Sequence, residues 1–166
     1  MSNDIKNTIP NNNGMPVYPG EEIFLDAIKL LKQLISTPSF SKEEGETAAI
    51  LERFFKEKNI EANRELNNLW SVNKYFDPNK FTVLLNSHHD TVKPNAGYTV
   101  DPFTPVEKEG KLYGLGSNDA GGSLVSLVLI FVHFYHIKDL PFNLIIDVTA
   151  EEEISGHDGI ENLLPK

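Results

Sequence analysis

The chain has 166 residues, the size of one ordinary domain, and 40% of them are hydrophobic, which is typical of a globular protein. Its formal net charge is −9 and its pI is about 5.0, which argues against nucleic acid and against an anionic membrane surface as partners. No cysteine is present, so disulfides, thiolate metal sites and cysteine nucleophiles are excluded, and a metal would have to be held by His, Asp and Glu.

The first third of the chain predicts an arm followed by two helices. Residues 1–20 are polar and rich in Asn, Pro and Gly, which indicates a flexible N-terminal arm. They lack a basic head followed by an apolar core, so we expect no secretory signal and a cytoplasmic protein. From Glu21 to Ser36 the apolar residues recur at helical spacing. Ser41-Lys-Glu-Glu44 has the form of a capping box, which predicts a second helix that extends to about Lys58.

Strands are predicted near Leu69–Tyr75, Phe81–Ser87 and Phe142–Thr149, where short apolar runs lie between turn signals. The segment Ala120–Ile137 is apolar for about the length that a bilayer requires. Two glycines at its start, two histidines within it and the lack of flanking aromatic and cationic anchors favour a buried core helix instead. Strands and helices interleave, so the predicted class is α/β, with a mixed, largely parallel sheet flanked by helices.

Histidine and acidic residues gather at three element ends. His88 and Asp90 follow a strand two residues apart, so both project to one side while His89 points away. Asp119 precedes the apolar segment in a glycine-rich stretch, and Glu151-Glu-Glu153 directly follows the last strand. Each cluster has an ordinary alternative: solvated histidines with an N-cap aspartate, an aspartate that caps a helix, and a solvated charge run. Because ligand sites lie at the carboxyl ends of strands in open α/β sheets, the three together have the parts of a two-metal hydrolase.

Three motifs in this order, SHHDTV (87–92), GLGSNDAGG (114–122) and AEEEISG (150–156), carry a family resemblance. The segment DPFTPVEKEGKLYG (101–114) separates the first two. Together they resemble the acetylornithine deacetylase and succinyl-diaminopimelate desuccinylase family of zinc aminoacylases and peptidases, from about Leu31 to the end of the chain. The resemblance implies a zinc-exopeptidase-like (phosphorylase/hydrolase-like) catalytic domain.

Transferred residue by residue, the resemblance implies metal-assisted amide hydrolysis with two zinc ions, which cobalt can replace. His88 and Glu153 would be zinc ligands, Asp119 would bridge the two ions, and Asp90 would support His88. Glu152 would be the general base, although the three adjacent glutamates also allow a register one residue earlier. The family also often has a cis peptide bond directly after the bridging aspartate.

The chain departs from the family pattern in two ways. The family has a lysine before glycine after the bridging aspartate, whereas Ala120-Gly121-Gly122 has none. Family members are also much longer, and their additional part holds further metal ligands. We therefore expect residues 21–166 to be the N-terminal portion of the catalytic domain, without the lid or dimerisation domain and the C-terminal portion, and to be inactive alone.

The implied function is hydrolysis of the amide bond of an N-acyl amino acid, acetylornithine deacetylase-like and acting in arginine biosynthesis. Two alternatives stay open: a di- or tripeptidase of the same family, and a non-catalytic binding module that keeps the fold. The implied partners are a small N-acyl amino acid and, through a domain absent from this chain, a second copy of the full protein.

Overall fold

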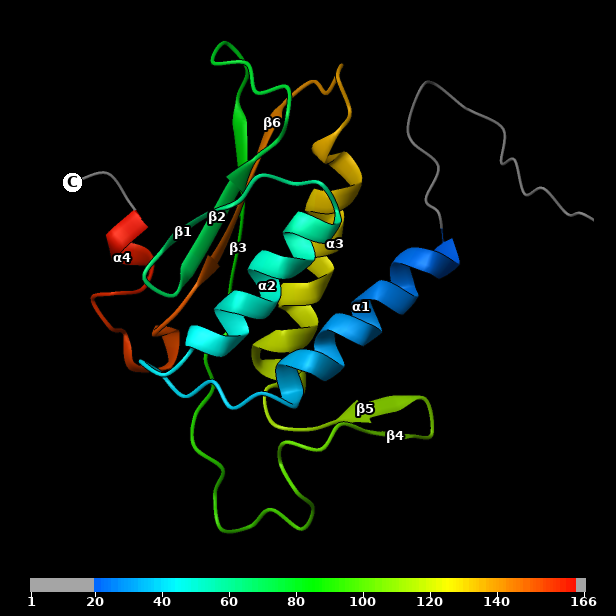
Figure 1. Cartoon of the computed structure of the whole chain (residues 1–166), viewed down its shortest axis with the longest axis vertical. Coiled ribbons are helices and arrows are strands. Elements are labelled where there is room, and N and C mark those ends of the chain that lie inside the picture. Colours follow the sequence, from blue (N-terminus) through cyan, green and yellow to red (C-terminus); the bar gives the residue numbers. More distant parts are fainter. Residues whose placement is uncertain (1–19, 164–166) are drawn as a thin grey trace, which may run out of the picture.

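The computed structural model describes residues 20–163, so the predicted arm at residues 1–20 lies outside the described range except for its last residue (Figure 1). The elements follow one another in this order: α1 (Gly20–Ile35), α2 (Gly45–Glu57), β1 (Asn63–Glu65), β2 (Asn68–Val72), β3 (Thr82–His88), β4 (Val106–Lys108), β5 (Lys111–Tyr113), the turn η1 (Ser117–Gly122), α3 (Ser123–Tyr135), β6 (Asn143–Thr149), the turn η2 (Glu152–Ile154) and α4 (Ile160–Leu163).

Four strands form one sheet in the order β1-β2-β6-β3, and β4 and β5 form a separate hairpin. The sheet is mixed, as predicted, and the fold class is confirmed. Among the described strands only the β3–β6 pairing is parallel, a smaller share than expected, while β1–β2 and β2–β6 are antiparallel. A parallel pair needs a long crossover, which α3 supplies between β3 and β6, whereas β1 and β2 are joined by two residues and must form a hairpin.

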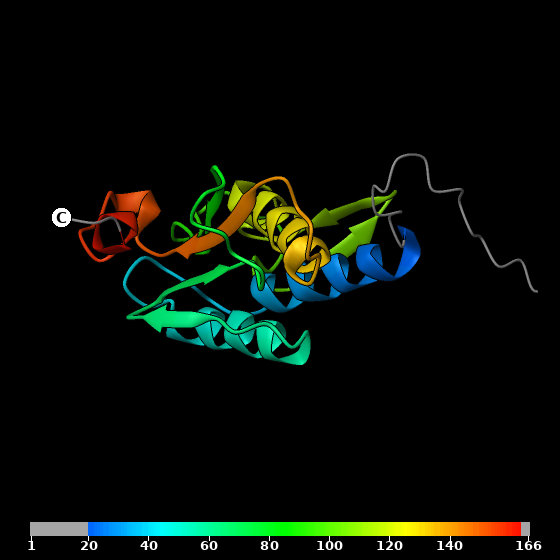
Figure 2. The ribbon, with the colours of Figure 1, turned by 90° about the horizontal axis from the view of Figure 1, so that it is seen from above.

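The helices α1, α2 and α3 lie on the same side of the sheet in both views (Figures 1 and 2). Along β3, Val83 and Leu85 face this helix layer, and Leu84, on the other face, is 48% exposed. The centre of the core is formed by residues with no exposed surface: Ala48, Leu51, Phe55, Leu69, Leu124, Val128, Phe131, Ile146 and Val148.

The apolar segment after the glycine-rich motif forms the core helix α3. By length and composition alone, Ser117–Tyr135 is a candidate membrane span. In the structure α3 packs against β3 and β6, and Leu124, Val128 and Phe131 are fully buried there. These contacts support the predicted core helix, because burial within the domain already accounts for the apolar composition.

The predicted capping box at the start of α2 is wrong. The helix begins at Gly45, and the side chain of Glu44, its N-cap residue, makes no capping hydrogen bond. Instead Glu44 Oε1 accepts the backbone N–H of Lys42 at 2.7 Å. The hydroxyl of Ser41 donates to Asp90 Oδ2, also at 2.7 Å. Both residues of the motif thus use tertiary or turn partners, which the local pattern cannot reveal.

Three short strands were not predicted. The three residues of β1 are polar and exposed, so no apolar alternation marks the strand. The hairpin of β4 and β5 turns at Glu109-Gly110, where both residues have positive φ (54° and 72°). A glycine after a polar residue is a known signal for such a turn, but the strands beside it have only three residues each.

Candidate metal centre

The parallel pairing of β3 and β6 brings the predicted site residues to one edge of the sheet. His88, the last residue of β3, pairs with Thr149, the last residue of β6. The chain then enters η2, which carries Glu152 and Glu153. Both strands end at this edge because parallel neighbours present their carboxyl ends on the same side.

Asp119 reaches the same edge from η1. Its backbone is not helical (φ −111°, ψ 103°), and the Asp119–Ala120 peptide bond is cis, as the family resemblance implies. The N-cap residue of α3 is Gly122, and no side chain caps that helix. Asp119 therefore does not cap α3, which removes the ordinary alternative considered for it.

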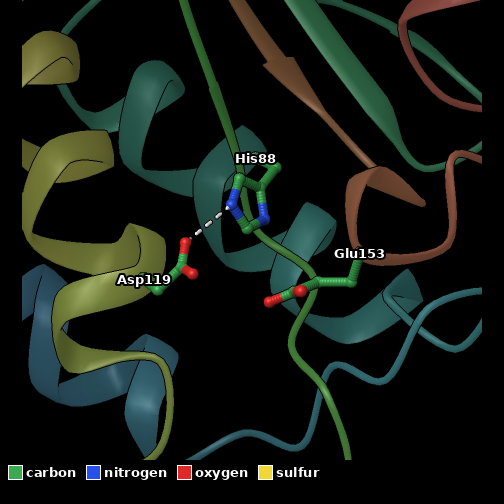
Figure 3. A group of neighbouring side chains, drawn as sticks. All are labelled: His88, Asp119 and Glu153. Atoms are coloured by element: carbon green, nitrogen blue, oxygen red, sulfur yellow. Dashed lines mark hydrogen bonds and ion pairs between the residues drawn. The ribbon is translucent and has the colours of Figure 1, made fainter.

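His88, Asp119 and Glu153 form a group whose donor atoms all lie within 4.8 Å of one another (Figure 3). His88 Nε2 is 3.2 Å from Asp119 Oδ1. The side chain of Asp119 is 77% exposed and Glu153 is partly buried, so the group opens toward solvent on one side. One imidazole nitrogen with carboxylate oxygens is a donor set that zinc accepts, and an open side is typical of catalytic rather than structural zinc sites. The residues present thus fit a metal ion.

Asp90 holds the ring of His88 from behind. The Asp90 side chain is fully buried, and its Oδ1 lies 3.2 Å from His88 Nδ1. This contact leaves Nε2 free to face Asp119, the arrangement expected for a metal-binding histidine with a supporting carboxylate. The two side chains thus lie side by side, with Nδ1 turned toward Asp90 and Nε2 toward Asp119.

The charges of the site shift the pKa values of this pair in opposite directions. The hydrogen bond to Asp90, with the negative charges of Asp90 and Glu152, outweighs burial and raises the pKa of His88 to about 9. Burial alone would raise the pKa of Asp90, but hydrogen bonds from His88, Ser41 and two backbone N–H groups lower it to about 2. The site therefore attracts positive charge.

The three adjacent glutamates occupy three different environments. Only Glu153 belongs to the donor group, and burial, with the nearby charge of Asp119, raises its pKa. Glu152 Oε2 is 3.6 Å from His88 Nε2, at the rim of the group, and its side chain is 59% exposed. Glu151 is buried, and its Oε2 lies against Gly156, where a Cβ would overlap it. A general base must reach bound substrate, and Glu152 meets that requirement better than Glu151.

His89 lies outside the donor group, as strand alternation predicts, but it is not a solvated loop residue. It is 6% exposed, and its Nε2 donates to the carbonyl oxygen of Asn67 at 2.9 Å. The ring therefore carries its proton on Nε2, and Nδ1 accepts from the hydroxyl of Thr47. Burial lowers the pKa of His89, which keeps the ring neutral.

Sequence reasoning missed two of the three residues that hold the glutamate turn, Asn68 and Glu44, and the contact of the third, Asp90, with that turn. Four successive backbone N–H groups, from Ala150 to Glu153, donate to side-chain oxygens from elsewhere in the chain. Asn68 accepts the first at 2.9 Å and Glu44 the second at 3.2 Å. The two oxygens of Asp90 accept the last two, each at 3.1 Å. Asp90 thus links His88 to the glutamates.

One signal in the sequence could have indicated Glu44. It precedes Ala48, Leu51 and Phe55 at spacings of four, three and four residues, so it lies on the buried stripe of α2. An acidic residue on such a stripe is buried only if its oxygens are hydrogen-bonded. No comparable signal marks Asn68.

Comparison with known proteins shows similarity to the family that the three motifs resemble. Residues 84–165 match the model of Peptidase family M20/M25/M40. The succinyl-diaminopimelate desuccinylase of Stenotrophomonas maltophilia (strain K279a) is 29% identical over 143 residues, which cover 82% of this chain and 37% of that protein. The acetylornithine deacetylase of Proteus mirabilis (strain HI4320) is 34% identical over 140 residues, which cover 77% of this chain and 36% of that protein.

Solved structures share the fold. Human carnosine dipeptidase 1 superposes with a TM-score of 0.69 at 22% identity, covering 85% of this chain and 35% of that one. A dinuclear metal-binding peptidase of the M20 family from Bacillus subtilis superposes with a TM-score of 0.64 at 16% identity, covering 87% and 39%. The fold is therefore that of the M20 catalytic domains, and the family resemblance predicted from the motifs is confirmed. The chain spans little more than a third of the length of the curated relatives it matches.

Proposed function

We propose that the chain is the N-terminal part of the catalytic domain of a two-zinc hydrolase that cleaves the amide bond of an N-acyl amino acid, in the manner of acetylornithine deacetylase. The observation that carries this proposal is the donor group of His88, Asp119 and Glu153 with Glu152 at its rim. Matches to a desuccinylase and a deacetylase, which act on acylated amino acids, support it.

In this proposal His88, Asp119 and Glu153 would hold the zinc ions. When bound, zinc would polarise the acyl carbonyl and lower the pKa of the attacking water. His88 supplies Nε2 because Asp90 occupies its Nδ1. The exposed side chain of Asp119 is available from the solvent side, where substrate would enter.

Glu152 transfers the proton. Its carboxylate takes a proton from the attacking water as the new C–O bond forms, and returns that proton to the amine nitrogen as the C–N bond breaks. The exposure of Glu152 and its 3.6 Å separation from His88 Nε2 support this register. The alternative register would require Glu151 to leave its buried position against Gly156.

A dipeptidase is the second candidate, because human carnosine dipeptidase 1 shares the fold and its name denotes cleavage of a dipeptide. Both functions need the same attack on an amide carbonyl, so the site does not separate them. The substrate would instead be chosen by contacts around the amino acid portion.

The test measures release of free amine by the complete, zinc-loaded gene product from N-acetylornithine, N-succinyl-diaminopimelate and carnosine. The Glu152→Gln variant of the protein is the control with each substrate. We expect the acylated amino acids to be cleaved in preference to carnosine. Preference for carnosine would replace the deacylase with a dipeptidase. Zinc binding without cleavage of any substrate would favour the non-catalytic binding module.

A further inference from the structure

The backbone of the glutamate turn depends on acceptors that the turn does not contain. β6 ends at Thr149, and η2 begins at Glu152. The first N–H groups of a short helical turn have no partner within it. Here the N–H groups of Ala150 to Glu153 are all accepted by three side chains, Asn68, Glu44 and Asp90. The position of the candidate base and ligand is therefore set from outside the turn.

Glu44 has contacts that a helix cap does not explain. It has no exposed surface and lies at the start of α2, yet its side chain does not cap that helix. Oε1 accepts the N–H groups of Lys42 at 2.7 Å and of Glu151 at 3.2 Å, and Oε2 accepts the side-chain amide of Asn67 at 2.8 Å. Among the described residues Glu44 forms no ion pair, and the donors to its carboxylate are all uncharged N–H groups.

Two of these contacts, with Glu151 and with Asn67, lead to the candidate metal centre through different segments. Glu151 directly precedes Glu152, and its backbone is in the left-handed region (φ 55°), a conformation that a non-glycine residue keeps only when its surroundings hold it. The carbonyl group of Asn67 accepts the proton of His89, the neighbour of His88. One carboxylate thus contacts the turn that carries the glutamates and, through Asn67, the segment that carries the histidine.

The geometry points to Glu44 as a positioning residue for Glu152 and Glu153. This role rests on the proposed function, since it concerns where the base and the ligand lie. Glu44 contacts no reacting atom. It acts through the N–H of Glu151, while Asp90 holds the next two N–H groups. Without Glu44, the N–H of Glu151 would have no acceptor between the N–H groups held by Asn68 and by Asp90.

The test compares Glu44→Ala and Glu44→Gln with Glu43→Gln, a matched control at the exposed neighbour. In Glu44→Ala the N–H of Glu151 loses its acceptor. Glutamine keeps one oxygen for Lys42 and Glu151, and the amide of Asn67 can turn to accept from the new NH₂ group. We therefore expect Glu44→Ala to disturb the turn and Glu44→Gln to restore it.

Amide hydrogen exchange of this chain is the first readout. Exchange of the amides from Ala150 to Glu153 should become faster in Glu44→Ala, while that of Val128 in the core of α3 stays unchanged. Zinc affinity of the complete gene product, by calorimetry, should fall about 10- to 100-fold, as is typical when the support of a ligand is removed. Both effects should largely disappear in Glu44→Gln and be absent in Glu43→Gln.

A uniform increase of exchange that includes Val128 would mean that Glu44 only stabilises the fold, and would overturn the proposal. If Glu44→Ala does not fold, wild-type exchange decides: the four turn amides must be protected although no strand pairs them, and free exchange would refute the role. Neither readout requires hydrolysis. Local effects in a protein that cleaves no substrate would refute the proposed function and leave the positioning role intact.

Discussion

The two regions that provide carboxylates to the candidate metal centre differ in how they are held. The turn after β6 is fixed by four hydrogen bonds from its backbone to buried side chains. Asp119, on η1, is 77% exposed in its side chain, and its carboxylate contacts His88 at 3.2 Å. The histidine and glutamate side of the site is therefore organised by the protein itself, whereas the aspartate side is available to respond to a bound cation.

A comparison of two buried aspartates, Asp90 and Asp147, shows how hydrogen-bond donors change the pKa of a carboxyl group. Asp90 receives four hydrogen bonds and has a pKa of about 2. Asp147, also buried, has one oxygen, Oδ1, without a hydrogen-bond partner, and burial raises its pKa to about 6. Burial raises the pKa of both carboxyl groups, so the hydrogen-bond donors decide whether the net shift is downward, as in Asp90, or upward, as in Asp147.

The largest expected effect concerns the proposed base on the organised side. Glu152→Gln should lower the rate of amide hydrolysis by about 10²- to 10⁴-fold, because proton transfer is lost. Zinc affinity should stay close to wild type, since Glu152 lies outside the donor group. Steady-state kinetics and zinc calorimetry on the complete gene product measure both.

Glu151→Gln is the matched control, because Glu151 is buried away from the donor group. It should retain most of the activity. Full activity in Glu152→Gln together with loss in Glu151→Gln would show that the register is one residue earlier.

Asp90→Ala should have the next largest effect. It leaves the hydroxyl of Ser41 and two turn N–H groups without their acceptor, and His88 Nδ1 keeps only the backbone carbonyl oxygen of residue 90. Each buried donor without a partner costs about 1–3 kcal/mol, so we expect a loss of about 3 kcal/mol or more in the free energy of unfolding. Urea denaturation measures it. Ser41→Ala, which removes one donor only, is the control, and an equal loss in both variants would contradict the central role of Asp90.

The raised pKa of Asp147 makes the stability of the folded chain depend on pH, which tests the contrast with Asp90. The pKa of Asp147 rises from 3.8 to about 6 on folding, so well below pH 3.8 it is protonated in both states and has no effect on stability. As pH rises toward 6 the unfolded chain ionises first, and the folded state loses up to about 3 kcal/mol, a loss that persists above pH 6.

Asp147→Asn should therefore stabilise the chain at pH 7 and have little effect at pH 4. Denaturation of wild type and variant across this range is the measurement, with Asp139→Asn, at an exposed position, as control. A difference that does not change with pH would show that Asp147 titrates normally in the folded state.

The sequence was informative where the physical signal is local. Continuous apolar residues predicted β6 and α3, and β3 was predicted within one residue at each end. His88, Asp119 and Glu153 were recognised because they lie in motifs at element ends, and the structure brings them together.

The residues that hold the site could not be predicted in the same way. Glu44 and Glu151 are 107 positions apart, and Asn68 and Ala150 are 82 apart. Ser41 and Glu44 match a local capping motif, yet Ser41 binds Asp90, which follows β3, and Glu44 binds Glu151, which follows β6. A hydrogen bond between distant segments leaves no periodic pattern in the sequence. The one local signal for Glu44 was its position in line with the buried stripe of α2.

The smallest expected effect tests the aspartate side. Asp119→Ala should change the free energy of unfolding of the metal-free chain by no more than about 0.5 kcal/mol, because the side chain is exposed and His88 Nε2, which loses its contact with Asp119, keeps the carboxylate of Glu152 at 3.6 Å. Its removal even relieves repulsion with Glu153, whose pKa it raises. Thermal unfolding without metal measures the change, beside Asp90→Ala as the contrasting variant. A destabilisation as large as that of Asp90→Ala would mean that η1 is held by the protein as firmly as the glutamate turn, and the two sides of the site would then be equally organised before any cation binds.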